Sequence, residues 1–307
     1  MSQKHLFFQV CYSLITLAML STITACGSRV PPETGTSIKV LATTSIIGDV
    51  VSQVGGNFID LSILMPVGTD PHDFQVKPQD IAIITEARVI FSSGGGLEAF
   101  LQPFLENAGA SGKNIEVSSG ITFRTSSDGG QATTDPHTWM DPNNVIIWTR
   151  NIAAALSDID PAHSSDYQTN AETYTRSLQD LDSWIRSEVS QIPLKNRLLV
   201  SDHAVLGYFA DQYGFSQEGS ITSSFSSEAA PSARELAALE DKIRQLGVRA
   251  IFVSEAVNQT MADQIAADTG IKTARIYHAS LTASSGQAPS YLEFMRYNVK
   301  AIVEALK

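Results

Sequence analysis

The stretch Asp160–Gln191, DPAHSSDYQTNAETYTRSLQDLDSWIRSEVSQ, has the pattern of one long helix. After Pro161 it contains no glycine or proline, and its apolar residues fall largely at spacings of three and four, which is typical of an amphipathic helix. At about 1.5 Å of rise per residue, such a helix could run much of the protein's height. We therefore expect this helix to join the parts of the chain on its two sides.

Apolar runs of strand length alternate with helical patterns on both sides of this helix. On the N-terminal side, the expected strands are Ile38–Thr43, Ile59–Met65, Val89–Ser92 and Asn114–Val117, and the expected helices are Ile46–Val54, Pro78–Ala87, Leu97–Asn107 and Asn143–Ser157. On the C-terminal side, the expected strands are Leu198–Ser201, Ala250–Val253 and Thr273–Ile276, and the expected helices are Val205–Tyr213, Ala233–Leu246, Gln259–Asp268 and Tyr291–Leu306. Such alternation implies parallel sheets covered by helices on both faces. The expected fold class is α/β, with two parallel-sheet lobes joined by a single long helix.

The first part of the chain has the features of an export signal. Residues Leu6–Ala25 are mostly apolar, and Ile23-Thr24-Ala25-Cys26 has the form of a lipoprotein cleavage site, so Cys26 is the expected lipidation site. The alternative is an uncleaved membrane helix, because about 20 apolar residues can span a bilayer. We expect residues 1–25 to form a lipoprotein signal peptide and residues 26–36 a linker. We expect an N-terminal α/β lobe at 37–159, the linking helix at 160–192 and a C-terminal α/β lobe at 193–307.

Cysteine content and charge exclude several classes of protein. The two cysteines are Cys11, inside the expected signal, and Cys26, so the mature domain has no thiolate for a metal and no cysteine nucleophile. The formal net charge of −11 argues against nucleic acid as a partner, because phosphate binding needs a basic surface.

Four of the six histidines lie where expected strands or loops end. His72 and His137 each follow an Asp-Pro pair, and His203 and His278 each follow an apolar run. Imidazole is the commonest protein ligand for borderline divalent metals. Open parallel sheets bind ligands beyond the carboxyl ends of their strands, so a metal held by both pairs would lie in the cleft between the lobes. The alternative is a set of scattered surface histidines.

Acidic residues near these histidines offer further oxygen atoms. The aspartates beside His72 and His137 could each accept the second ring N–H of a metal-bound imidazole. Asp202 could orient His203 or reach the metal directly, and Glu255 could be a spare ligand, although a hydrogen-bonding or surface role suits Glu255 better. The sequence contains no phosphate-binding loop and no Gly-x-Ser-x-Gly elbow.

Three segments carry a family resemblance: Gly68-Thr69-Asp70-Pro71-His72, Asp135-Pro136-His137-Thr138-Trp139-Met140-Asp141-Pro142, and the closing helix with Tyr297-Asn298. Over about Ile38–Leu306 the chain resembles the metal-specific solute-binding lipoproteins of bacterial ABC importers, which capture zinc or manganese. The resemblance implies two α/β lobes joined by a rigid helix. It also implies that His72, His137 and His203 are metal ligands.

The fourth ligand position departs from the family pattern. The family usually has an aspartate where an ungapped match puts Ala279, in Tyr277-His278-Ala279-Ser280-Leu281. Either His278 replaces that aspartate, or water or another carboxylate fills the position; we expect His278. The histidine-rich loop of many zinc-specific members is absent, because Gly120–Thr134 contains no histidine and reads as a flexible loop.

The expected function is extracytoplasmic capture of a divalent transition metal for an ABC permease, without catalysis. Three or four imidazoles favour Zn²⁺ over Mn²⁺, which prefers more oxygen ligands, and iron is a third possibility. The protein is expected to be a monomer, lipid-anchored on the outer face of the cell membrane. Two alternatives remain open: an exported zinc-dependent hydrolase with Asp202 or Glu255 as general base, and a metal-binding adhesin.

Overall fold

The computed structural model describes residues 37–107, 109, 111–126, 133–222, 225, 231–254 and 259–307. Residues Ser37–Lys307 form one compact unit. The expected signal peptide, Cys26 and Glu255 lie outside the described residues. None of the helices in these described ranges combines the length and the hydrophobicity that a membrane-spanning segment needs.

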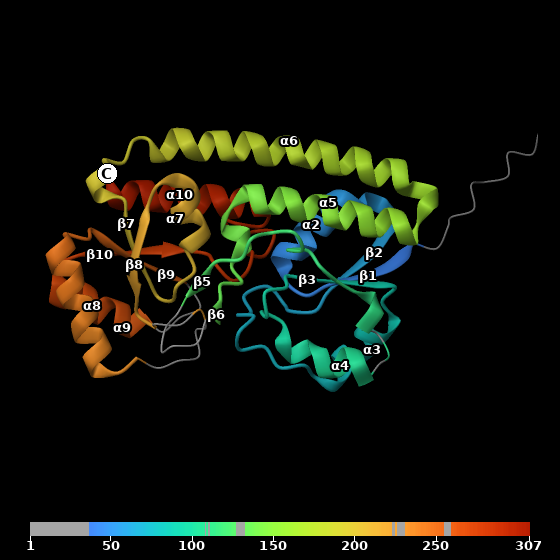
Figure 1. Cartoon of the computed structure of the whole chain (residues 1–307), viewed down its shortest axis with the longest axis horizontal. Helices are drawn as coiled ribbons and strands as arrows, with labels where there is room; N and C mark the ends of the chain where they lie inside the picture. Colours follow the sequence, from blue (N-terminus) through green and yellow to red (C-terminus); the bar gives the residue numbers. More distant parts are fainter. Residues whose placement is uncertain are drawn as a thin grey trace, which may run out of the picture. The chain divides into compact units, whose positions relative to one another are not determined.

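Two four-stranded parallel sheets form the framework (Figure 1). The first has the order β2-β1-β3-β4, with β1 Ile38–Ala42, β2 Ile59–Ile63, β3 Val89–Ser92 and β4 Asn114–Glu116. The second has the order β10-β9-β7-β8, with β7 Leu198–Ser201, β8 Ser216–Ser220, β9 Ala250–Ser254 and β10 Lys272–Ile276. The expected α/β class with two parallel-sheet lobes is confirmed.

Helices connect the strands and cover the sheets. Before the long helix they are α2 Ser45–Gly55, α3 Pro78–Glu86, α4 Gln102–Asn107 and α5 Pro142–Ile159. After it they are α7 Gly207–Tyr213, α8 Ala233–Leu246, α9 Gln259–Thr269 and α10 Tyr291–Leu306. The strand order reverses direction along each sheet, and with right-handed connections this reversal places helices on both faces.

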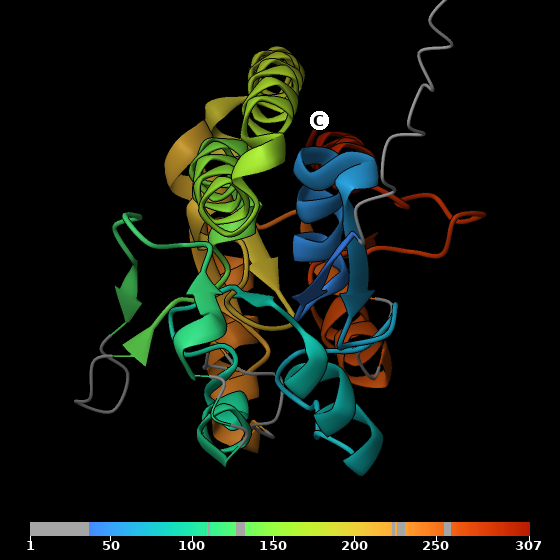
Figure 2. The ribbon, with the colours of Figure 1, turned by 90° about the vertical axis from the view of Figure 1, so that its right-hand side faces the viewer.

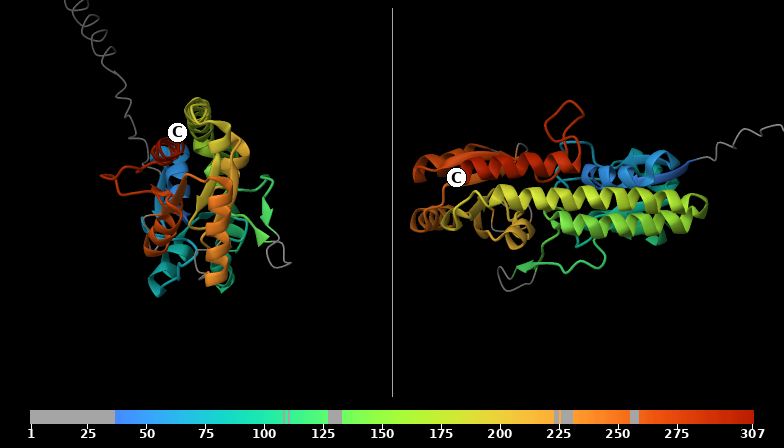
Figure 3. Two further views of the ribbon diagram at one scale, coloured as in Figure 1. Left: turned by 90° about the vertical axis from the view of Figure 1, so that its left-hand side faces the viewer. Right: turned by 90° about the horizontal axis from the view of Figure 1, so that it is seen from above.

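The long helix is α6, Ser164–Val189, with 26 residues. A 3₁₀ turn, Pro161–His163, precedes it, so the α-helix begins four residues after Asp160. Its apolar residues Leu178, Leu181 and Ile185 are fully buried, as their helical spacing predicts. Contacts of α6 with α2, α5 and α10 bring together helices from both halves of the chain (Figure 2; Figure 3, right).

One apolar core extends across both sheets beneath these helices. Alternate side chains of a strand point to the same face of its sheet. In this way Val40 and Ala42 of β1, like Ala250 and Phe252 of β9, face the helical layer that contains α6. Leu41 faces a separate core with α3 and α4. The other face of the second sheet packs against α8 and α9 through a third core. The shared core therefore fixes both sheets to the same helices.

Three local features differ from the sequence-based expectation. Residues 120–134 contain a short antiparallel ladder, in which β5 Thr125–Ser126 pairs with β6 Thr133–Thr134. Strand β8 was not expected, because Ser-Gln-Glu-Gly-Ser has no apolar alternation; pairing with β7 at the edge of the sheet forms it. The helix expected from Leu97 begins instead with a 3₁₀ turn at Ala99–Leu101.

Candidate metal centre

The four predicted histidines come from four different connections. His72 lies in the loop after β2, and His137 follows β6 and precedes a 3₁₀ turn, Thr138–Met140. Asp202 and His203 directly follow β7, and His278 follows β10. Three of these residues, His137, His203 and His278, are each only 1% exposed. The alternative of scattered surface histidines is therefore wrong for these three.

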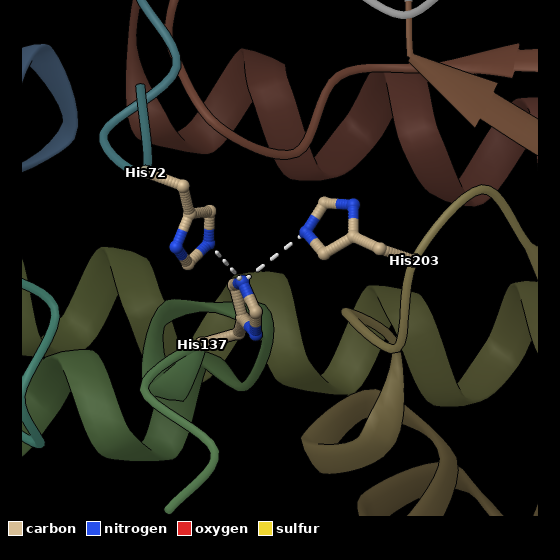
Figure 4. A group of neighbouring side chains, drawn as sticks. All are labelled: His72, His137 and His203. Atoms are coloured by element: carbon tan, nitrogen blue, oxygen red, sulfur yellow. Dashed lines mark hydrogen bonds between the residues drawn. The ribbon is translucent and has the colours of Figure 1, made fainter. Parts of the chain in front are cut away.

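His72, His137 and His203 converge on one point (Figure 4). The Nε2 atom of His137 lies 3.2 Å from Nε2 of His72 and 3.3 Å from Nε2 of His203. The candidate ligand atoms of the three residues all lie within 4.8 Å of one another. Three ring nitrogens facing each other in a buried place form a site that could hold one metal ion.

Asp135 fixes the orientation of His137. Its Oδ1 atom accepts hydrogen bonds from the backbone N–H of His137 at 3.0 Å and from the ring Nδ1 at 2.8 Å. A proton held on Nδ1 leaves the Nε2 lone pair free to face the other two imidazoles. In the His72 loop, Asp70 Oδ1 instead accepts the backbone N–H of His72 at 2.9 Å. Asp135 therefore contacts the second ring nitrogen of its neighbouring histidine, as an acid that orients a metal-bound imidazole would.

Asp202 holds two histidines at once. Its Oδ1 accepts the backbone N–H of His203 at 2.7 Å and lies 3.2 Å from the ring Nδ1 of His203, close enough for an ion pair but poorly directed for a hydrogen bond. Its Oδ2 lies 3.1 Å from Nε2 of His278 and accepts the Ser254 backbone N–H at 2.7 Å. Asp202 therefore contacts both imidazoles that follow strands of the second sheet.

His278 belongs to a second group rather than to the first. It groups with Asp202 and His203, and its ring centroid lies 4.5 Å from that of His203. Its Nδ1 is buried and has no hydrogen-bond partner among the described residues. His203 is therefore the residue that the two groups share, and the ring of His278 lies beside it.

Burial governs the protonation of these residues. Desolvation, reinforced by the neighbouring imidazoles, lowers the pKa of His72 to about 4 and lowers the pKa of His137 and His203 below the usual value. For His278, burial acts in the same direction, but the Asp202 carboxylate outweighs it and raises the pKa. Burial raises the pKa of Asp135 to about 7. The three converging imidazoles are thus neutral at pH 7, the form that can bind a metal.

Trp139 and a neighbouring cavity border the site. The Trp139 Nε1 donates to the backbone carbonyl of His278 at 2.8 Å, and its ring centroid lies 5.2 Å from that of His137. A cavity of about 320 Å³ lies beside His278 and is also lined by Gly68, Ala279 and Ser280. Position 279 therefore borders open space, where a longer side chain could be placed.

Sequence reasoning missed Arg124 and the role of Tyr208. The Tyr208 hydroxyl accepts from the Arg124 backbone N–H at 3.0 Å and donates to the Asp135 carbonyl at 2.9 Å. The Arg124 Nε lies 3.6 Å from Asp135 Oδ2. Arg124 lies in a mostly polar segment without a helical or strand-like hydrophobic pattern, so these contacts cannot be predicted from the sequence.

A family model described as zinc-uptake complex component A, periplasmic, matches residues 40–305. The chain belongs to this family. It is therefore a solute-binding protein of the metal-importing ABC systems and not an enzyme, and the alternative of a zinc-dependent hydrolase is wrong.

Similar proteins differ in the metal that their names specify. The manganese-binding lipoprotein MntA of Halalkalibacterium halodurans is 30% identical, over 97% of this chain and 99% of MntA. The iron-binding protein YfeA of Yersinia pestis is 27% identical, over 95% of this chain and 94% of YfeA. A manganese-bound periplasmic metal-binding protein of Candidatus Liberibacter asiaticus has a TM-score of 0.80 at 26% identity, covering 88% of this chain and 100% of its own. These similarities support a metal cargo without distinguishing zinc from manganese.

The lowered pKa of His72 predicts how the metal-free protein responds to acid. Because the native pKa is about 4 and the reference value is 6.5, the unfolded chain binds more protons between these values. As the pH falls from 6.5 to about 4.5, wild type should lose about 2 kcal/mol of unfolding free energy relative to His72→Gln. Urea unfolding in the presence of a chelator measures this difference. Parallel pH profiles for the two proteins would contradict it.

Proposed function

We propose that this protein captures one divalent transition metal through His72, His137 and His203 and delivers it to an ABC permease. The observation that carries the proposal is the approach of the His137 Nε2 atom to the Nε2 atoms of His72 and His203, at 3.2 and 3.3 Å. Neutral imidazoles so close together, each with a lone pair, repel unless a proton or a cation lies between them. A metal ion removes that repulsion.

We propose Zn²⁺ as the preferred cargo, with Mn²⁺ as the alternative. A tetrahedral zinc ion with Zn–N bonds of about 2.0–2.1 Å separates neighbouring nitrogens by about 3.3 Å. The distances around His137 fit this value. Imidazole also suits zinc better than manganese, which prefers oxygen ligands. The relatives named for manganese are the reason to keep Mn²⁺ as the competitor in every test.

We propose His278 as the fourth ligand, through its unpartnered Nδ1. Its Nε2 lies 3.1 Å from Asp202 Oδ2, so the proton of the neutral ring would lie on Nε2 and the lone pair on Nδ1. This carboxylate–histidine pairing is the usual arrangement behind a metal-bound imidazole. It would compensate for Ala279, which has no ligand atom.

For the location of the protein, we propose a lipid anchor at Cys26 and a position on the outer face of the cell membrane. The Ile23-Thr24-Ala25-Cys26 pattern supports this, as do relatives named lipoproteins. We propose that the anchored protein acts as a monomer, with the lobes at residues 37–159 and 193–307 joined by the helix at 160–192.

Substitution of the converging histidines tests the site. His72→Ala, His137→Ala and His203→Ala should each abolish tight Zn²⁺ binding, because each removes one of three nitrogens. His163→Ala is the matched control, since His163 stacks on Phe58 and pairs with Asp160 instead. Competition with a fluorescent chelator measures the affinities. Wild-type affinity in His203→Ala would refute a site built from both sheets.

Metal selectivity tests the role of His278. The double variant His278→Ala, Ala279→Asp replaces an imidazole by a carboxylate, so it should bind Mn²⁺ better relative to Zn²⁺ than wild type does. Paired competition titrations with the two metals give this ratio. His278 is not a ligand if the double variant keeps the wild-type ratio of Zn²⁺ to Mn²⁺ affinity and His278→Ala keeps the wild-type affinity for Zn²⁺.

Cell fractionation tests the anchor. Cys26→Ser should release the protein from the membrane fraction or leave an uncut precursor, whereas Cys11→Ser should leave anchoring unchanged. Mass spectrometry of the N-terminus identifies the lipid and the cleavage site. A Cys26→Ser protein that stays in the membrane fraction with a processed N-terminus elsewhere would rule out lipidation at this residue.

A further inference from the structure

Arg124 lies where the two halves of the site meet. It immediately precedes β5, and its carbonyl accepts the backbone N–H of Asp135 at 2.9 Å across the base of the β5–β6 ladder. The Tyr208 hydroxyl bridges the same two residues, accepting from Arg124 and donating to Asp135. Tyr208 belongs to α7, the helix that follows His203. The backbone beside His137 is therefore tied to the helix next to His203.

The Arg124 guanidinium joins a buried carboxylate to an exposed one. Its Nε lies 3.6 Å from Oδ2 of Asp135, which is fully buried, and its Nη1 forms an ion pair with Asp211 on α7. Neither Asp135 Oδ2 nor Arg124 Nε has a hydrogen-bond partner in the described part of the chain, so the two groups face each other as opposite charges. The other carboxylate oxygen of Asp135 is the one that holds His137.

Gly207, the first residue of α7, makes room for the guanidinium. A Cβ atom at Gly207 would lie 2.5 Å from Arg124 Nε and 3.0 Å from Asp135 Oδ2. Both distances are shorter than ordinary van der Waals contacts. The guanidinium thus fits closely between Asp135 and the start of α7, and an added methyl group would displace it.

We infer that Arg124 is a positioning residue for the metal site, holding the Asp135 carboxylate that orients His137 and linking it to the helix that follows His203. This inference rests on the proposed metal capture by His72, His137 and His203. A guanidinium suits the task because its planar fork can engage Asp135 and Asp211 at the same time, which a lysine ammonium on a flexible stem does less well. Loss of a group that orients a ligand typically weakens metal binding about 10- to 100-fold.

The test compares Arg124→Met with wild type, using Zn²⁺ affinity and the visible absorption spectrum of bound Co²⁺. We expect 10- to 100-fold weaker Zn²⁺ binding, an altered Co²⁺ spectrum, and partial rescue by Arg124→Lys. Arg244→Met is the matched control, because Arg244 forms exposed ion pairs with Glu240 and Asp241 within α8; it should match wild type. Gly207→Ala should act like Arg124→Met while retaining the charge.

Two results would overturn the role of Arg124. One is wild-type affinity and an unchanged Co²⁺ spectrum in Arg124→Met. The other is weaker binding with an unchanged Co²⁺ spectrum and a matching loss of metal-free stability, which would indicate a structural role only. If wild type binds neither Zn²⁺ nor Co²⁺, the proposed metal capture is refuted, and the role of Arg124 that rests on it is refuted too. Binding by wild type and loss of binding in His137→Ala establish the site independently of Arg124.

Discussion

The common apolar core beneath α5 and α6 is the constraint on which the site depends. Residues of both sheets, such as Phe91 of β3 and Phe252 of β9, pack in the same core as Leu178 and Leu181 of α6. Large buried side chains each contribute roughly 1.5–3 kcal/mol through burial, so moving one sheet against the helical layer would expose much apolar surface. The connections that carry His72, His137 and His203 are held together by this core, although they are far apart in the sequence. A site made from loops alone would lack such support.

The electrostatics of the site follow from burial. Taking an imidazole out of water disfavours its charged form, which explains why the pKa values of His72, His137 and His203 are all lowered. Asp135 and Asp202 lie beside the Nδ1 atoms of His137 and His203, whose Nε2 atoms face the point of convergence. A cation at that point would meet neutral nitrogens first and carboxylate charge at longer range. Burial thus keeps the three converging imidazoles in the neutral form that metal binding requires.

Much of this arrangement could be predicted from the sequence, and the remainder shows what periodicity cannot report. The spacing of apolar residues predicts the parallel strands and the long helix. The positions of the histidines in the sequence, just after these strands or in the loops, predict that they meet at the ends of the sheets. Strand β8 and the β5–β6 ladder have no apolar alternation, so only their tertiary pairing reveals them. Arg124 could not be identified because its partners Asp135, Tyr208 and Asp211 come together only in the folded chain. The sharing of Asp202 between His203 and His278 is likewise a property of two adjacent loops in space.

X-ray absorption at the zinc edge of the metal-loaded protein tests the central claim most directly, since it reports the identity and distance of the atoms bound to the ion. Three or four imidazole nitrogens at about 2.0–2.1 Å, with the multiple-scattering pattern of histidine rings, are expected. A spectrum of oxygen ligands without imidazole scattering would contradict capture of the metal by His72, His137 and His203.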